Sequence, residues 1–141
     1  DFAGAIQDYN KAIELKPDGA FAFNNRGSAK RNLGDVEGAI QDYNKAIELN
    51  PDYAFAFNNR GNAKNNLEDF AGAIQDYNKA IELKPDDASA FNNRGIAKNN
   101  LGDLKGAKQD YDKVIELDPD NRVAYHDRER VICDLKKKPE Y

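Results

Sequence analysis

The residues best suited to catalysis or metal binding are a single histidine, His126, and a single cysteine, Cys133. On a helix their spacing would place them on one face, but a closed metal site needs further ligands of this kind. The acidic run 118–121 lacks the glycine and terminal glutamate of a calcium loop, so it predicts a turn between helices. We therefore expect no catalytic residues, no metal site and no cofactor, and a protein that is not an enzyme.

Arginine and aspartate recur in matching positions along the chain. The arginines are Arg26, Arg60 and Arg94, and the aspartates are Asp42, Asp76 and Asp110. They could form a charged ligand pocket or a repeated ion pair within the packed wall. We favour the ion pair, because removing one partner of a buried pair typically costs about 3–5 kcal/mol.

These residues recur because the whole chain repeats with a period of 34 residues. Three copies span residues 19–52, 53–86 and 87–120, and a final segment covers 121–141. Residues 1–18 are identical to residues 69–86. A fixed period of this length is typical of a solenoid, in which each unit buries its apolar face only by stacking on its neighbours.

Each copy contains two segments with helical periodicity, not the alternation of a strand. In the copy 19–52, one side of the first segment carries the small and apolar residues Ala22, Phe23, Gly27, Ala29 and Leu33. The small residues Gly27 and Ala39 would let the two helices cross closely, and a bulky residue there would cost roughly 1–3 kcal/mol. Each unit is therefore expected to be a pair of antiparallel helices.

The residues between the two segments favour a tight turn. Gly34 suits the left-handed backbone that ends a helix, and Asp35 suits the cap of the next one. The second helix is expected to begin near Val36 and to end before Pro51. In the next copy Glu68 replaces the glycine, and a left-handed backbone there would cost on the order of 1 kcal/mol.

On this period, an aromatic, Gly, Ala, aromatic, Ala, Pro pattern at Phe23, Gly27, Ala39, Tyr43, Ala46 and Pro51 resembles the tetratricopeptide repeat. The resemblance implies an all-α fold: a right-handed superhelical solenoid of antiparallel helix pairs, with three full repeats and an orphan helix at each end. It divides the chain into a second helix of a truncated repeat (1–18), repeats at 19–52, 53–86 and 87–120, and a C-terminal capping helix and tail (121–141). The capping helix is expected to begin near Arg122.

In this family the first helices line a concave face that binds an extended peptide or a partner helix. The resemblance places the candidate peptide-binding residues on that face: Phe21, Asn24, Asn25, Ser28, Phe55, Asn58, Asn59, Asn62, Asn66, Asn92, Asn93, Ile96 and Asn100. Asparagine both donates and accepts hydrogen bonds, so a ladder of amides can bind a peptide backbone whatever its side chains. The alternative is a duplicated polar stripe that only contacts solvent.

Three of these asparagines, Asn25, Asn59 and Asn93, resemble the asparagine ladder in the repeat superhelix of the O-linked N-acetylglucosamine transferase family. Some co-chaperone tetratricopeptide domains instead hold a C-terminal carboxylate with lysines and an arginine. This chain has asparagine or phenylalanine at most of those positions, so carboxylate recognition is not expected.

The leading functional prediction is a protein–protein interaction scaffold that binds a peptide or partner protein along the asparagine-rich groove. A formal charge of -4 and a pI near 5.1 disfavour nucleic acid as a partner, and no segment is apolar enough to predict a membrane partner. The single cysteine leaves the compartment open, with the cytoplasm as the default. A chain that starts within a unit and lacks methionine indicates a piece of a longer array.

The N-terminal helix lacks the first helix of its own pair. Its apolar residues Phe2, Ala5, Ile6 and Tyr9 should therefore be uncovered, and a homo-oligomeric contact near residues 1–15 is expected. Two alternative functions follow from the same pattern. The array could assemble with itself through its ends, or it could be the accessory binding arm of a larger enzyme.

Overall fold

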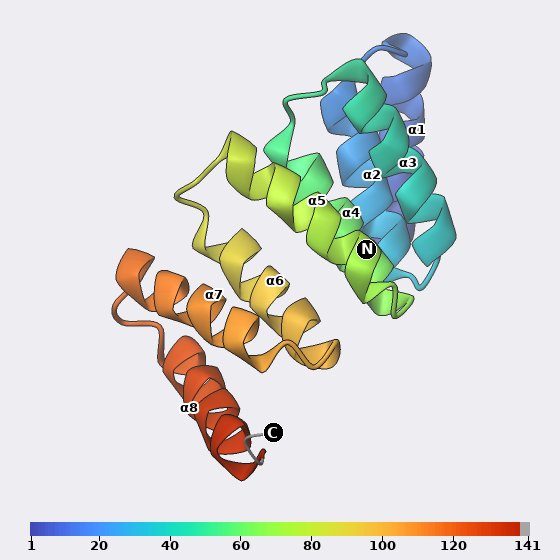
Figure 1. The fold of residues 1–141 in the computed structure, drawn as a ribbon. Coiled ribbons are helices and arrows are strands. Elements are labelled where there is room, and N and C mark those ends of the chain that lie inside the picture. The colour runs from blue at the N-terminus through green and yellow to red at the C-terminus, as the bar shows by residue number, and fades with distance from the viewer. Residues whose placement is uncertain (139–141) are drawn as a thin grey trace.

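The structure is a computed structural model that describes residues 1–138, and within that range it contains eight helices and no strand (Figure 1). The helices are α1 (Phe2–Leu15), α2 (Ala20–Asn32), α3 (Val36–Leu49), α4 (Ala54–Asn66), α5 (Phe70–Leu83), α6 (Ala88–Asn100), α7 (Leu104–Leu117) and α8 (Arg122–Lys137). The end of the expected tail, residues 139–141, lies outside the described residues. The all-α helical-repeat fold expected from the sequence is confirmed.

The helices pack in chain order, each against the next, as a stack with α1 and α8 at opposite ends (Figure 1). Three hairpins make up the stack: α2 with α3, α4 with α5, and α6 with α7. The first helices of successive hairpins also contact each other, α2 with α4 and α4 with α6. We call α2, α4 and α6 the inner helices, because this closer spacing puts them on the inner side of the curve, and α3, α5 and α7 the outer helices.

The core is a seam of small and aromatic side chains that runs from hairpin to hairpin. Tyr43 and Ala39 of α3 are fully buried and pack against Ala63 of α4 in the next hairpin. The same arrangement recurs where Tyr77 of α5 meets Ala97 of α6. Each hairpin thus buries its aromatic residue partly against its neighbour, as stacked repeats require.

The two helices of each hairpin approach so closely that only glycine fits at the crossing. A Cβ atom at Gly61 would lie 2.6 Å from Cε1 of Tyr77, and one at Gly27 would lie 2.9 Å from Cε1 of Tyr43. These separations are well inside van der Waals contact. The close crossing expected at Gly27 is confirmed, and the tyrosine ring of the outer helix is what excludes a side chain there.

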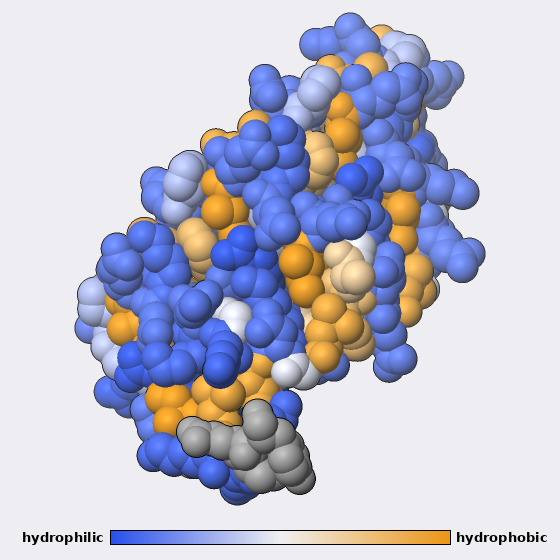
Figure 2. All heavy atoms as spheres, in the orientation of Figure 1, coloured by the Kyte–Doolittle hydropathy of each residue, from blue (hydrophilic) through white to orange (hydrophobic). Residues whose placement is uncertain are grey.

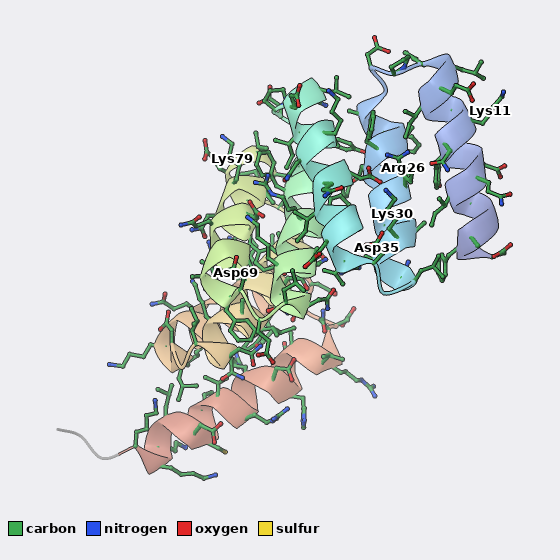
Figure 3. The ribbon with its side chains drawn as sticks, turned by 90° about the vertical axis from the view of Figure 1, so that its right-hand side faces the viewer. Lys11, Arg26, Lys30, Asp35, Asp69 and Lys79 are labelled. Carbon is green, nitrogen blue, oxygen red and sulfur yellow. The ribbon has the colours of Figure 1, made fainter. Side chains whose placement is uncertain are left out.

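The turn between the helices of each hairpin uses two local devices. The Asp35 side chain accepts a hydrogen bond from the backbone N–H of Gly38 at 3.0 Å, and Asp69 caps α5 in the same way (Figure 3). The residue before each cap has a left-handed backbone, with φ of 89° at Gly34 and 61° at Glu68. The expected cap is confirmed, and Glu68 adopts the left-handed conformation despite its side chain.

A repeated ion pair joins the two helices of each hairpin. In the middle hairpin, Nε and Nη2 of Arg60 donate to the carboxylate of Asp76 at 2.9 and 2.7 Å, and Lys64 Nζ lies 3.0 Å from the same group. The Asp76 side chain is only 5% exposed. The first hairpin repeats the arrangement with Arg26, Lys30 and Asp42. The ion pairs therefore lie in the wall of the solenoid, the packed contact between the inner and outer helix of each hairpin, as we expected.

The same arginines also link one hairpin to the preceding helix. Arg60 uses its third nitrogen, Nη1, to donate to Asn44 of α3 at 3.0 Å, and its guanidinium lies 5.5 Å from the ring centroid of Phe57. Figure 3 shows the equivalent Arg26 on α2 between α1 and α3, and Arg26 donates to Asn10 of α1. Each arginine therefore contacts three helices.

The last junction, between α7 and α8, replaces this amide contact with a charged one. Arg128 donates to Asp112 at 3.2 Å, and Lys108 donates to the other carboxylate oxygen at 2.9 Å. Burial alone would raise the pKa of Asp112, but the hydrogen bonds from Lys108 and Arg128 hold it below its ordinary value. The junction between α7 and α8 is therefore held by ion pairs.

We predict that Asp76→Ala lowers the free energy of unfolding by about 3 kcal/mol, because it leaves Arg60 and Lys64 without a counter-charge in the wall. Urea unfolding followed by circular dichroism measures this loss. The control is Glu82→Ala, which removes an exposed partner of Lys79 and should cost about 0–1 kcal/mol. Equal losses in the two variants would contradict a structural role for the buried pair.

We predict that Glu68→Gly raises the free energy of unfolding by about 1 kcal/mol, since glycine relieves the left-handed backbone. The matched variant is Gly34→Ala, where an added Cβ would meet no atom within 4 Å. It should therefore lose about the same amount through backbone strain alone. Thermal and urea unfolding of both variants check the prediction, and a Glu68→Gly variant no more stable than the parent would refute it.

Candidate functional site

The residues expected to bind a peptide all lie on the inner helices. Phe21, Asn24, Asn25 and Ser28 belong to α2, Phe55 to Asn66 belong to α4, and Asn92 to Asn100 belong to α6. Two aromatic side chains are open to solvent, with Phe21 69% and Phe55 53% exposed. Figure 2 shows one face of the stack, on which hydrophobic patches alternate with hydrophilic surface.

The adjacent asparagines of α2 and of α4 have different environments, whereas both asparagines of the α6 pair are partly exposed. Asn24 and Asn58 are buried, with 5% and 7% of their surface exposed, whereas Asn59 and Asn93 are partly exposed. Nδ2 of Asn59 donates to Oδ1 of Asn24 at 3.0 Å, and Nδ2 of Asn93 donates to Oδ1 of Asn58 at 3.3 Å. These bonds join neighbouring inner helices, so buried Asn24 and Asn58 orient the side chains of Asn59 and Asn93 on the next helix.

The amides of Asn59 and Asn93 keep most of their hydrogen-bonding capacity. A carboxamide has two N–H donors and an oxygen with two lone pairs, and one N–H of each side chain is used. Among residues 1–138, no donor reaches Oδ1 of either residue. Each inner helix junction therefore holds one amide in a fixed orientation with an acceptor and a donor available.

Buried tyrosines of the outer helices support other polar residues of this face. The Tyr43 hydroxyl lies 3.0 Å from Oγ of Ser28, and the Tyr77 hydroxyl donates to Oδ1 of Asn62 at 2.7 Å. Burial raises the pKa of Tyr43 and Tyr77, and it raises the pKa of Tyr111 to about 12. The hydroxyls therefore stay protonated at neutral pH, and Tyr77 keeps its bond to Asn62.

Sequence reasoning missed Tyr53, which belongs to this surface. Its hydroxyl accepts a hydrogen bond from Nδ2 of Asn24 at 3.4 Å, and its ring meets Phe55 edge to face at 6.4 Å. Lys84 Nζ lies 5.1 Å from the ring centroid of Phe55. The sequence did distinguish this residue, because the equivalent positions in the other copies are Gly19 and Asp87.

Arg31 is a second residue that the candidate set left out. Its counterparts in the next copies are Asn65 and Asn99, so Arg31 brings a charge to a position that is neutral in the other copies. Its Nε atom is buried and has no hydrogen-bond partner among residues 1–138. Burial raises the pKa of Tyr77, and the positive charge of Arg31 offsets part of that rise.

His126 and Cys133 lie together on the exposed face of α8, at the far end of the stack. With Glu129 and Asp134 they line a hollow of about 360 Å³. Within the described residues, no group of three or more histidine, cysteine, aspartate or glutamate side chains could hold a metal ion. Nor is any helix of residues 1–138 long and apolar enough to cross a membrane.

Two of the solved structures that are similar to this chain carry bound peptides. The first TPR of Spaghetti (RPAP3), solved with the HSP90 peptide SRMEEVD, is 30% identical over 84% of this chain and 94% of that chain, with a TM-score of 0.82. The second TPR domain of human RPAP3, solved with the HSP70 peptide SGPTIEEVD, is 32% identical over 84% of this chain and 96% of that chain, with a TM-score of 0.77.

A third solved structure, MamA, is 25% identical over 96% of this chain and 80% of that chain, with a TM-score of 0.90. No curated protein matches the chain by sequence. Family models described as TPR repeat match residues 1–32, 27–67 and 63–102, and one described as tetratricopeptide repeat matches residues 88–121. The chain belongs to the tetratricopeptide repeat family.

Proposed function

We propose that this chain is an interaction scaffold that binds an extended peptide along its inner helices and carries out no reaction of its own. The observation that supports this most directly is the pair of amides at Asn59 and Asn93. Each is oriented by a bond to the preceding inner helix and has both an acceptor and a donor available. The similarity to RPAP3 domains solved with peptides supports the same class of partner.

The amides suit a peptide backbone better than a particular side chain. A peptide group offers one N–H and one C=O, and the available atoms of Asn59 and Asn93 complement both. Because their orientation is already fixed within the array, binding would order little that is mobile in the free protein. A typical hydrogen bond contributes about 0.5–1.5 kcal/mol, so several are needed for useful affinity.

The exposed phenylalanines supply apolar contacts beside this polar ladder. Phe55 contacts the Tyr53 ring in a T-shaped arrangement and lies next to Lys84, although half of its surface remains open. Phe21 occupies the same position one repeat earlier and is more exposed. We infer that apolar side chains of the bound peptide pack on these rings, since buried aromatic contacts dominate many interfaces.

The chain is poorly suited to bind a peptide mainly through its terminal carboxylate. The repeated lysines Lys30, Lys64 and Lys98 all pair with wall aspartates at 3.0 to 3.2 Å. None of the candidate peptide-binding residues is charged, and Arg31 is the one cation of the inner helices without an ion-pair partner within 4.0 Å among residues 1–138. We therefore infer that the chain binds an internal, extended segment of a peptide. Binding of a terminal carboxylate would need several cations that are not already paired.

We predict that replacing Asn59 and Asn93 together by alanine weakens peptide binding roughly fivefold to a hundredfold, the loss of about two hydrogen bonds. Selecting a random dodecapeptide display library on the parent chain provides the ligands. Fluorescence anisotropy of the enriched peptides then measures both affinities. Ligands that bind parent and variant equally would exclude the amide ladder as the site.

The matched control for that experiment replaces Gln41 and Gln75, two exposed amides on the outer helices. This double variant removes the same chemical groups from the opposite side of the hairpins and should leave affinity unchanged. Urea unfolding of both variants must be compared as well, because the alanines also remove two bonds between inner helices. A folded Asn59 and Asn93 variant with lost binding supports the proposal.

Self-assembly through the ends of the solenoid is the alternative function, and one observation favours it. No residue of α1 is buried, so its apolar side chains remain open to a second copy. Light scattering of the intact chain over a wide concentration range tests this. A dimer that Tyr9→Arg converts to a monomer would support assembly through α1, and a monomer throughout would exclude it.

A further inference from the structure

We propose that Arg31 binds an acidic side chain of the peptide and thereby fixes which peptide residue lies on which inner helix. The inference rests on the proposed function, because it concerns a ligand that is already held by the amides of Asn59 and Asn93. It adds the chemical class of one ligand side chain, the carboxylate of an aspartate or glutamate. Three features of Arg31 support it: it occurs in one copy only, its charge is unpaired, and it lies on the inner face of α2.

The amide ladder alone cannot fix the register of a bound peptide. Asn25, Asn59 and Asn93 are equivalent residues of successive copies, and an amide can bind any peptide group. Packed helices lie about 8–10 Å apart, and an extended chain covers roughly 3.3–3.6 Å per residue. A peptide that slides by about two or three residues would therefore form the same hydrogen bonds again. Only a residue that differs between the copies can prevent this sliding.

Arg31 is the difference between the inner helices that involves a charge. The sequences of α2, α4 and α6 differ at three positions only. Two of these positions exchange neutral side chains: one has phenylalanine or serine, and the other has serine, asparagine or isoleucine. The third has Arg31 in α2 but Asn65 and Asn99 in the next two inner helices. A charged group of the ligand would therefore bind differently at α2 than at α4 or α6.

The charge of Arg31 has no counter-charge in the part of the chain that the structure describes. The other cations of the inner helices pair with wall aspartates, as Arg60 and Lys64 do with Asp76. Among residues 1–138, no carboxylate lies within 4.0 Å of Arg31, and its buried Nε atom has no hydrogen-bond partner. A partly buried guanidinium without partners loses hydration that nothing in the protein replaces. A ligand carboxylate would supply both a counter-charge and hydrogen-bond acceptors.

The position of Arg31 on α2 directs its side chain toward the amide ladder. Asn24, Ser28 and Arg31 have the spacing i, i+4 and i+7, so they share one face of the helix. Long side chains on a helix generally point back toward its N-terminus, which favours a guanidinium above Ser28. The charge of Arg31 also offsets part of the rise in pKa that burial causes in Tyr43 and Tyr77, which supports this placement. Arg31 therefore flanks the ladder toward the C-terminal end of α2.

The exposed phenylalanines flank the same ladder on its other side. Phe55 is four residues before Asn59, about 6 Å toward the N-terminus of α4. Arg31 is seven residues after Asn24, about 10 Å toward the C-terminus of α2. Successive side chains of an extended chain point to opposite sides. Peptide residues that contact the phenylalanines should thus be apolar, and the acidic residue should lie an odd number of residues away from them.

An acidic side chain suits this site better than the terminal carboxylate of a peptide. One cation is enough for it, because the amides of Asn59 and Asn93 hold the backbone independently. The formal net charge of -4 means that the chain does not attract acidic peptides in general. The preference for an acid should therefore be confined to one position of the peptide, and added salt should weaken it.

The test starts from a random dodecapeptide library in which linkers flank the peptide at both ends, so that its own C-terminal carboxylate is absent. Selection on the intact chain should enrich peptides with aspartate or glutamate at one position, an odd number of residues from an apolar residue. Replacing that acid by its amide should weaken binding about tenfold, the loss of one hydrogen bond to a charged group. Fluorescence anisotropy of synthetic peptides with blocked ends measures this loss.

The chain itself supplies the matched variant, because the next two copies have asparagine in place of Arg31. In Arg31→Asn, exchange of the peptide acid for its amide should change affinity by no more than about twofold, the usual error of additivity. The double variant Arg31→Asn with Asn65→Arg should favour an acid displaced by about two residues, the step that keeps its side chain on the same side of the peptide. Lys105→Asn removes an exposed cation from an outer helix and should leave every affinity unchanged.

Urea unfolding of each variant accompanies the binding measurements, and the exchange of acid for amide on the parent chain tests the proposal without any variant. Enriched peptides that have no acid at a fixed position, or only at even separations from the apolar residue, would overturn the inference. An acid that contributes as much with Arg31→Asn as with the parent, or binding that requires a free C-terminus, would also overturn it.

The outcomes also separate this inference from the proposed function. Peptides that require Asn59 and Asn93 but no acid would overturn the role of Arg31 and leave the amide ladder standing. Peptides that keep their affinity when both asparagines are replaced by alanine would reject the ladder itself. A library that yields no enriched peptide would reject both.

Discussion

The guanidinium of each repeated arginine is the contact on which this solenoid depends. Arg60 binds Asp76 of its own hairpin with two nitrogens, reaches Asn44 of the preceding helix with the third, and stacks on Phe57. The seam around it consists mainly of alanine, glycine and tyrosine, which pack closely but specify orientation poorly. Directional bonds at the arginine fix the angle of each helix with respect to two others. Regular stacking follows from repeating that one contact.

Placing the charges in the wall determines the character of the inner face. Because the repeated lysines and arginines are paired with aspartates, few cations remain for a ligand. The inner helices present amides instead, and these are held by further bonds between neighbouring helices. Wall and face are therefore made by different residues of the same helix.

Periodicity in the sequence predicted the helices, their turns and the pairing of Arg60 with Asp76, because a 34-residue repeat identifies equivalent residues in every hairpin. It could not separate the two asparagines of the pair in α4. Asn58 is buried and Asn59 is not, a difference set by contacts between residues 35 apart in adjacent hairpins. Tyr53 was missed for a related reason, since it occurs in one copy only and a repeat pattern discards such residues. Variation between copies therefore deserves as much weight as their agreement.

The bond from each repeated arginine to an asparagine of the preceding helix recurs at successive junctions, at 2.9 to 3.0 Å. A junction of this kind makes the same contact whichever two copies it joins. Unequal recombination between neighbouring copies could therefore delete or add a whole hairpin, and the arginine–asparagine bond would still form at every new junction. The array can therefore lengthen or shorten by one hairpin at a time. The length of its inner face can change in this way without new contacts between hairpins.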